Sequence, residues 1–169
     1  MKIIPARKKI KSQSDLREEI HRLQKQGKKV VFSNGVFDLL HIGHFRYLEK
    51  ARSMGDVLVV GINTDKSVKR LKGNHRPLLP EKERAELLAG FGCVDYVTLF
   101  GEDTPLKIIV ALHPDILAKG ADYKISEIVG AKEVMGWGGK VKRIEFMKGY
   151  STSQFIEKIK KVSRKERKE

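Results

Sequence analysis

The sequence predicts an α/β fold in which a five-stranded parallel sheet is doubly wound, with helices on both of its faces. Three observations support this fold class. Five short apolar runs are separated by segments whose apolar residues recur at helical spacing. The run 56–62 is almost continuously apolar, which is typical of a strand buried on both faces. Polar or glycine-containing motifs follow four of the runs, at the ends where parallel strands open onto ligand sites.

A helix is predicted to precede the first strand. Ser12 is a suitable N-cap, an apolar stripe follows it at helical spacing, and Gly27 ends the segment. We expect this helix to pack against an edge of the sheet. The first strand is the apolar run 29–32, which leads into the turn residues Asn34 and Gly35.

The helix after this strand is predicted to begin at Ile42 and to end at Gly55. Its expected buried stripe consists of Ile42, Phe45, Leu48 and Ala51. His41 and His44 then lie at its first turn, three residues apart and on the same side. The first backbone N–H groups of a helix lack internal partners, so this turn is suited to an anion such as phosphate. Gly43 has no Cβ atom and would let a phosphate approach the backbone.

The rest of the chain is expected to continue the alternation of strands and helices. The further predicted strands are 56–62, 94–100, 116–120 and 141–146. The further predicted helices begin at 63–65, 80, 104–106, 125 and 151. Leu87 and Leu88 are expected on the inner face of their helix, Thr104 is expected to cap the next one, and the helix from Ile125 is expected to reach Trp137.

The net charge of +14 is concentrated at the two ends of the chain. The first eleven residues hold five basic and no acidic side chains, and the last thirteen hold seven basic and three acidic ones. We interpret these ends as solvated, so nucleic acid is not an expected partner, and a basic nucleic-acid-binding module is the alternative from another functional class. No apolar run approaches the roughly 18 residues of a membrane span and no secretory signal is visible, so we expect no membrane partner and a cytoplasmic location.

Several common types of site are not favoured. The single cysteine, Cys93, leaves no thiolate cluster for zinc, and the HExxH arrangement is absent. No GxxxxGK[ST] or GxGxxG motif occurs, which argues against P-loop and dinucleotide sites. For His41 and His44 the alternative to a functional role is a pair of packing or surface histidines.

The residues around the two histidines resemble the HxGH signature of the cytidylyltransferase-like nucleotidyltransferases. A strand ending Asn34-Gly-Val-Phe-Asp38 is followed by His41-Ile-Gly-His44. Further motifs stand in the order found in the heptose 1-phosphate adenylyltransferase branch: Lys69-Arg70-Leu71-Lys72-Gly73 with Arg76-Pro77, Glu102-Asp103-Thr104-Pro105, Lys119-Gly120-Ala121-Asp122-Tyr123, and Gly149-Tyr150-Ser151-Thr152-Ser153. The resemblance covers about residues 28–160 and implies a Rossmann-like sheet. We therefore expect an N-terminal basic segment and helix (1–27), a nucleotidyltransferase domain (28–160) and a basic C-terminal tail (161–169).

The resemblance implies transfer of AMP from ATP to a sugar 1-phosphate. An oxygen of D-glycero-D-manno-heptose 1-phosphate would attack the α-phosphorus of ATP, giving ADP-heptose and pyrophosphate for lipopolysaccharide core biosynthesis. Mg²⁺ would assist, held mainly by the ATP phosphates. The expected partners are thus the small molecules ATP and a sugar 1-phosphate, and the oligomeric state is left open, with a homodimer as one alternative.

The resemblance also implies roles for individual residues. The catalytic residues would be His41, His44 and Lys72. The nucleotide would contact Val36, Phe37, His41, Gly43, His44, Lys119, Gly120, Asp122, Tyr123, Gly149, Ser151, Thr152 and Ser153. The sugar phosphate would contact Asn34, Asp38, Lys69, Arg76 and Arg84. For Asp38, fixing the histidine turn and touching the metal are alternatives between which the sequence does not choose.

Two departures from the cytidylyltransferase branch bear on the choice of nucleotide. Phe146 stands where that branch has an arginine, and the arginine often found after the Ser-Thr signature is missing. Both departures weaken an assignment to CTP. Within the class, a cytidylyltransferase acting on glycerol 3-phosphate or another alcohol phosphate is the alternative.

Overall fold

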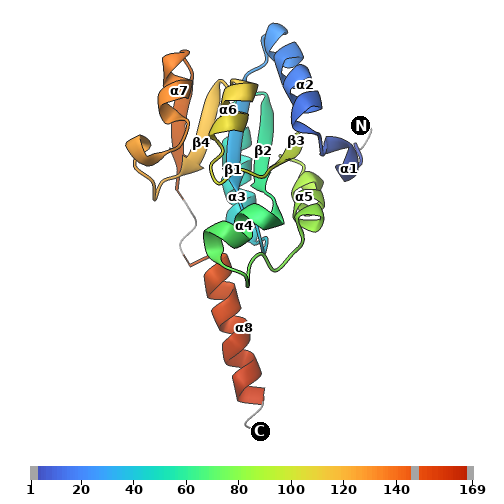
Figure 1. Cartoon of the computed structure of the whole chain (residues 1–169), viewed down its shortest axis with the longest axis vertical. Helices are drawn as coiled ribbons and strands as arrows, with labels where there is room; N and C mark the ends of the chain where they lie inside the picture. Colours follow the sequence, from blue (N-terminus) through green and yellow to red (C-terminus); the bar gives the residue numbers. More distant parts are fainter. Residues whose placement is uncertain (1–3, 146–148, 167–169) are drawn as a thin grey trace.

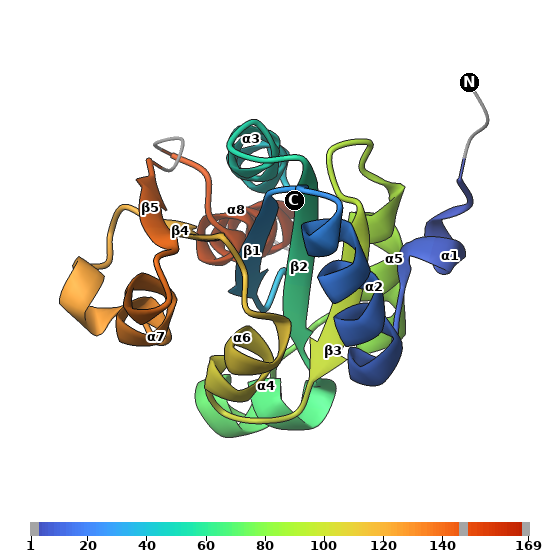
Figure 2. The same cartoon turned by 90° about the horizontal axis from the view of Figure 1, so that it is seen from above.

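The computed structural model describes residues 4–145 and 149–166, the latter with side chains up to 162. These residues form a five-stranded parallel sheet in the order β3-β2-β1-β4-β5, with helices on both faces (Figures 1 and 2). The strands are β1 (Val30–Gly35), β2 (Val57–Asn63), β3 (Tyr96–Phe100), β4 (Ile116–Gly120) and β5 (Lys140–Ile144). β2 and β3 lie on one side of β1, and β4 and β5 lie on the other. The predicted doubly wound, Rossmann-like α/β fold is therefore confirmed.

The helices cover the sheet in two layers. They are α1 (Ala6–Lys9), α2 (Gln13–Lys25), α3 (Ile42–Arg52), α4 (Asp65–Lys72), α5 (Glu81–Gly90), α6 (Leu106–Leu112), α7 (Ala131–Gly136) and α8 (Thr152–Glu166), with a 3₁₀ turn η1 (Ile125–Glu127). The predicted cap of α2 is present, because the Ser12 hydroxyl accepts a hydrogen bond from the Asp15 N–H. Within 4–145 and 149–166, no helix combines the length and apolar character that a membrane crossing requires.

Two hydrophobic cores lie between the sheet and the helices, one on each face of the sheet. One core joins α3 and α5 to one face of the sheet, and the other joins α2, α6 and α7 to the opposite face (Figure 2). Every residue of β2 is buried, as its continuous apolar run predicts. α2 also lies against the edge strand β3, where the Tyr96 hydroxyl donates to the Glu19 carboxylate at 2.8 Å.

The buried side of α3 differs from the predicted stripe. Leu48 and Ala51 are buried, but Ile42 is 41% exposed and Tyr47 takes its place in the core. The buried positions of the helix are therefore 43, 47, 48 and 51, whereas positions 42, 45, 48 and 51 were predicted. The Tyr47 and Ser33 hydroxyls, 2.8 Å apart, share a hydrogen bond that satisfies this polar tip inside the core. The helix ends at Arg52, before the predicted stop at Gly55.

Three other local predictions are wrong. Leu87 is exposed, and Arg84 instead faces the interior from α5. The long helix predicted after β4 is broken into η1 and α7, because Gly130 adopts a φ of +85° and an added Cβ there would lie 2.8 Å from the Ile109 side chain. α6 begins at Leu106 without a side-chain cap, so Thr104 does not have the predicted capping role.

α8 extends away from the body of the molecule (Figure 1). Its predicted N-cap is present, since the Ser151 hydroxyl accepts from the Gln154 N–H at 3.2 Å. Residues 161–166, expected to form part of a tail, continue this helix. Phe146, the expected end of the last strand, lies outside the described residues.

Candidate active site

A cleft of about 470 Å³ opens at the carboxyl ends of the strands. The predicted site residues that line it are Asn34, Val36, Phe37, Asp38, His44, Lys72, Arg76, Lys119, Tyr123, Ser151, Thr152 and Ser153. A smaller cavity of about 190 Å³ shares Asn34, His44 and Lys119 with the cleft and adds Gly120 and Asp122. The structure thus brings together segments that are more than 100 residues apart in the chain.

Five predicted site residues line neither cavity. His41 and Gly43 lie at the start of α3 next to His44, and Gly149 precedes α8. Lys69 is exposed on α4, and Arg84 is enclosed in the protein.

The two histidines form a stacked pair at the start of α3. Their ring centroids are 3.8 Å apart, and the far side of the His41 ring stacks on Phe155 of α8 at 5.7 Å. Burial lowers the pKa of both rings, and the pKa of His44 falls to about 4 with a smaller repulsive contribution from His41. Both imidazoles are therefore neutral at pH 7. Each can still donate one N–H hydrogen bond to a phosphate oxygen.

Gly43 makes room for this stack. A Cβ atom on Gly43 would lie 3.0 Å from Nδ1 of His41 and 3.2 Å from Cβ of Tyr150. The sequence interpretation gave Gly43 the task of admitting a phosphate, but the space beside it is taken by the His41 ring. Phe37 supports the opposite side, with its ring edge-on to His44 at 5.2 Å. Phe37 has a φ of +49°, an uncommon conformation for a residue with a side chain that the surrounding packing must maintain.

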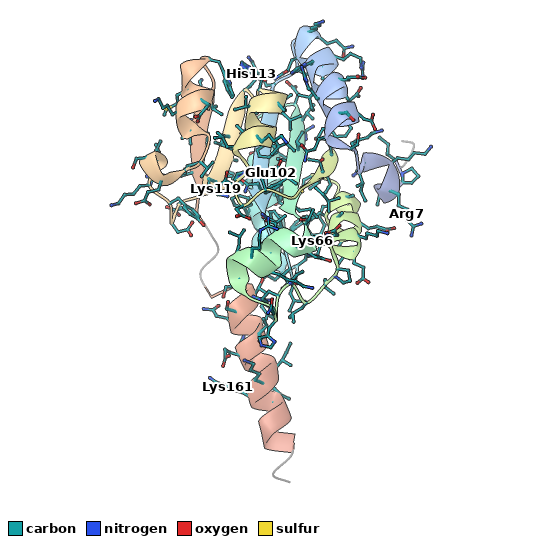
Figure 3. All side chains as sticks on the ribbon, in the orientation of Figure 1. Arg7, Lys66, Glu102, His113, Lys119 and Lys161 are labelled. Atoms are coloured by element: carbon teal, nitrogen blue, oxygen red, sulfur yellow. The ribbon has the colours of Figure 1, made fainter. Side chains whose placement is uncertain are left out.

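Lys119 lies where the two cavities meet. Its ammonium group donates to the backbone oxygen and to Oδ1 of Asn34, at 3.2 and 3.1 Å. Burial lowers the pKa of Lys119 to about 8, and the charge of Asp122 opposes this shift. Figure 3 shows Lys119 within the body of the molecule, whereas Lys161 lies on the projecting α8. At pH 7 Lys119 is mostly charged, and its two hydrogen bonds to Asn34 hold the ammonium group where the two cavities meet.

The contacts of Asp38 show what this carboxylate does. Asp38 is 4% exposed, and its Oδ1 accepts from the N–H groups of Leu78 and Leu79 at 2.7 and 3.0 Å. Its Oδ2 accepts from Nη1 of Arg76 at 2.6 Å. Both oxygens are thus engaged by the loop that follows α4. Of the roles left open by the sequence, the structure supports a positioning role. Asp38 holds this loop, and Arg76 with it, next to the histidine turn.

Arg84 has the same bracing character and is completely buried. Its guanidinium donates to the backbone oxygens of Leu79, Val36 and Asn63 at 3.0, 2.6 and 2.8 Å. A fourth bond reaches Oδ1 of Asp65 at 2.8 Å. This placement contradicts the expected contact between Arg84 and a sugar phosphate, because the guanidinium is directed at protein oxygens inside the fold.

The start of α8 forms another part of the cleft. Ser151, Thr152 and Ser153 all line it, and the Thr152 hydroxyl donates to the Leu39 oxygen at 3.4 Å. α8 is thereby joined to the histidine turn. Since the first N–H groups of a helix lack internal partners, the N-terminus of α8 is a favourable place for phosphate oxygens.

The site assignment from the sequence left out ten residues that line the cleft. They are Gly35, Asn63, Leu71, Phe100, Asp103, Thr104, Pro105, Glu127, Ile128 and Val129. Asp103 had a signal in the sequence, because it belongs to the quoted motif 102–105 after β3, but no role was assigned to it. Glu127 had no such signal, because its position depends on the break at Gly130.

A comparison with known proteins identifies the family. The family model described as cytidylyltransferase-like matches residues 32–158, which include all of the cleft-lining segments. This chain belongs to the cytidylyltransferase-like family.

Curated relatives in this family are longer proteins. The bifunctional protein HldE of Citrifermentans bemidjiense is 59% identical over 151 residues, which are 89% of this chain and 31% of that protein. The bifunctional protein HldE of Helicobacter pylori strain J99 is 54% identical over 147 residues, 87% of this chain and 31% of that protein. The chain therefore spans about a third of the length of these relatives.

Solved structures agree with the fold. The lipopolysaccharide core biosynthesis protein from Thermoplasma volcanium is 34% identical with a TM-score of 0.60, over 74% of this chain and 100% of that chain. A pantothenate synthetase from Thermus thermophilus is 18% identical with a TM-score of 0.55, over 81% of this chain and 61% of that chain. The second similarity is informative for the fold alone.

The cleft offers little to hold a metal ion by protein ligands. Among the residues that the structure describes, no three or more histidine, cysteine, aspartate or glutamate side chains are grouped so that they could bind one. Mg²⁺ commonly takes only one or two carboxylates and completes its shell with water and substrate phosphates. A Mg²⁺ ion bound in this way does not need a group of three such side chains.

Proposed function

We propose that this chain is an ATP-dependent adenylyltransferase. It transfers AMP from ATP to D-glycero-D-manno-heptose 1-phosphate and yields ADP-heptose and pyrophosphate, for lipopolysaccharide core biosynthesis. The observation that carries the proposal is the histidine pair at the start of α3, with His44 opening into a cleft that Lys72, Lys119 and the start of α8 also line. This set of donors and cations suits a nucleoside triphosphate.

The reaction is a direct displacement at phosphorus. A phosphate oxygen of the sugar 1-phosphate forms a bond to the α-phosphorus of ATP, the bond from that phosphorus to the bridging oxygen breaks, and pyrophosphate leaves with the electron pair. His41 and His44 donate hydrogen bonds to phosphate oxygens as neutral imidazoles. Lys72 and Lys119 offset the negative charge that develops. No covalent intermediate with the protein is required.

The similar proteins support the choice of acceptor. The Thermoplasma volcanium protein is described as acting in lipopolysaccharide core biosynthesis and aligns over its whole length. The motifs quoted for the heptose 1-phosphate adenylyltransferase branch occur in order along the part of this chain that matches the family. Neither the Thermoplasma volcanium protein nor the order of the motifs favours the cytidylyltransferase alternative.

Three further features belong to the proposal. Mg²⁺ accompanies ATP and lowers the charge repulsion between its phosphates and the incoming phosphate oxygen. Residues 28–160 are the proposed nucleotidyltransferase domain, with 1–27 as an N-terminal basic segment and helix and 161–169 as a basic end. The proposed location of the reaction is the cytoplasm.

A panel of substrates tests the proposal. Pyrophosphate release is measured for ATP, CTP and GTP, each with D-glycero-D-manno-heptose 1-phosphate or glycerol 3-phosphate, in the presence of Mg²⁺. We expect turnover with ATP and the heptose, at least 100-fold faster than with any other pair, and a product with the mass of ADP-heptose.

Two outcomes of the same panel would contradict the proposed function. Turnover with CTP and glycerol 3-phosphate, without turnover of ATP and the heptose, would assign the chain to the cytidylyltransferase alternative. Absence of pyrophosphate release from every pair, together with binding of nucleic acid, would favour the basic binding module.

A further inference from the structure

The lining of the cleft includes two carboxylates, Asp103 and Glu127, that the proposed displacement does not use. Asp103 comes from the loop after β3 and Glu127 from η1 after β4, so they approach the cleft from different segments. Asp103 belongs to the quoted motif 102–105, but neither carboxylate was assigned to the nucleotide or to the sugar phosphate. Their chemistry needs an explanation in a site for anionic substrates.

A carboxylate is an unfavourable neighbour for a phosphate. Two like unit charges at about 4 Å repel by about 1 kcal/mol in bulk water and by about 4 kcal/mol at an effective dielectric of 20. The phosphates are better placed beside Lys72, Lys119 and the N-terminus of α8, which line the same cleft. Asp103 and Glu127 therefore mark the region of the cleft that receives an uncharged part of a substrate.

Asp103 is held so that one oxygen stays available. Nε and Nη2 of Arg70 both contact its Oδ1, at 2.8 and 2.7 Å, and Arg70 is itself anchored on the Gly101 oxygen at 2.6 Å. Within the described part of the chain, Oδ2 of Asp103 has no hydrogen-bond partner. Glu127 is arranged similarly, because its Oε2 accepts from the Lys124 N–H at 3.2 Å and Oε1 has no partner among the described residues.

The surroundings of these two oxygens match a sugar. Carboxylates accept strong hydrogen bonds from hydroxyl groups, and Thr104, which also lines the cleft, adds a further hydroxyl. The exposed side chains of Leu71 and Val129 supply apolar surface in the cleft against which the C–H groups of a sugar can pack. A polyol with a phosphate at one end would thus meet acceptors along its carbon chain and cations at its phosphate.

We propose that Asp103 and Glu127 bind hydroxyl groups of the acceptor sugar and so determine its selection over hydroxyl-poor phosphates. The inference rests on the proposed function, since it names the part of that site which recognises the sugar. Arg70 acts through Asp103 as a positioning residue. The available oxygens accept the sugar hydroxyls, while the histidine pair and the lysines serve the phosphates.

Kinetics of Asp103→Asn and Glu127→Gln test the inference. Each change removes a charge and keeps the shape of the side chain. Because a hydrogen bond to a charged group is worth more than one to a neutral group, we expect KM for the heptose 1-phosphate to rise about tenfold in each variant. KM for ATP, the Mg²⁺ requirement and inhibition by inorganic phosphate, which has no sugar hydroxyls, should stay within twofold of wild type.

Glu133→Gln is the matched control, because Glu133 lies on neighbouring α7 and outside the cleft. It should leave all of these constants unchanged, and thermal unfolding of the three variants should match wild type within a few degrees. A raised Mg²⁺ requirement or a raised KM for ATP in Asp103→Asn or Glu127→Gln, with KM for the sugar unchanged, would assign the carboxylates to the metal-bound nucleotide and overturn the inference.

The two proposals fail in different ways. A wild-type chain that does not turn over ATP and the heptose refutes the proposed function and removes the inference with it. A wild-type chain that does turn them over, with unchanged KM for the sugar in both variants, refutes the inference alone.

Discussion

Two groups of polar side chains at the same end of the sheet differ in their partners. The bracing group is Asp38 and Arg84, whose carboxylate and guanidinium each form several hydrogen bonds to other parts of the fold. The histidine pair is His41 and His44, whose buried Nδ1 atoms have no hydrogen-bond partner in the described part of the chain. The difference separates groups that hold loops from groups whose hydrogen-bonding capacity is not used within the described protein.

The energetic consequences of the two arrangements differ as well. A buried polar atom without a partner costs about 1–3 kcal/mol, so a fold keeps one only where something else requires it. In the bracing group the desolvation of the charges is offset by hydrogen bonds to the residue after β1, to the end of β2 and to the loop after α4. The residue type alone does not distinguish an arginine that binds a ligand from a structural one. The groups that its side chain contacts do.

Removal of a brace should have the largest effect. Arg84→Met leaves the Asp65 carboxylate and three backbone oxygens without their donor, so we expect the free energy of unfolding to fall by about 3–5 kcal/mol. Urea denaturation followed by circular dichroism measures it. Arg17→Met, at an exposed position of α2, is the control and should change stability by no more than about 0.5 kcal/mol. A loss below 1 kcal/mol in Arg84→Met would refute the bracing role.

Removal of one histidine of the pair should act on the reaction instead. His44→Ala removes a donor that the proposed function assigns to the phosphates, and the loss of one such donor lowers kcat by about 10²–10³-fold. The measurement is pyrophosphate release at saturating substrates. Urea denaturation at pH 7 should show a much smaller loss of stability than in Arg84→Met. His21→Ala, on α2, should keep wild-type turnover, and near-wild-type kcat in His44→Ala would exclude a catalytic role.

The lowered pKa of His44 should have a smaller effect, which is a dependence of folding stability on pH. The pKa is about 4 in the folded chain and near 6.5 in the unfolded chain. Below pH 6.5 the unfolded chain therefore binds a proton that the folded chain does not, so stability is lost as pH falls from 6.5 towards 4. The contribution is at most about 3 kcal/mol.

Urea denaturation at pH 7.0, 5.5 and 4.5 measures this contribution as the difference between wild type and His44→Asn. Wild type should lose more stability than the variant over this range. Parallel pH profiles would show that the His44 ring is not desolvated in the folded protein.

Local signals predicted most of the fold. The five strands, the cap at Ser12 and the helix starts near Thr64 and Ser151 could be recognised because they are indicated by residues that are adjacent in the chain. The inner side of α3 could not, because Phe45 and Tyr47 are both large and aromatic and the choice between them depends on the hydrogen bond that Ser33 offers. The break after β4 could not either, because Gly130 adopts its positive φ as the residue before α7 while packed against Ile109, which is distant in the sequence.

The sequence by itself determined the order of strands and helices, the position of the histidine turn and the family, because these reside in contiguous residues. Only the tertiary structure decided which charged side chains face the cleft. Asp38 meets Arg76, and Arg84 meets Asp65, through loops that come together when the sheet forms. Asp103 and Glu127 line the same cleft for the same reason. Electrostatic partners are set by distance in space, and that distance is not encoded in the spacing of residues along the chain.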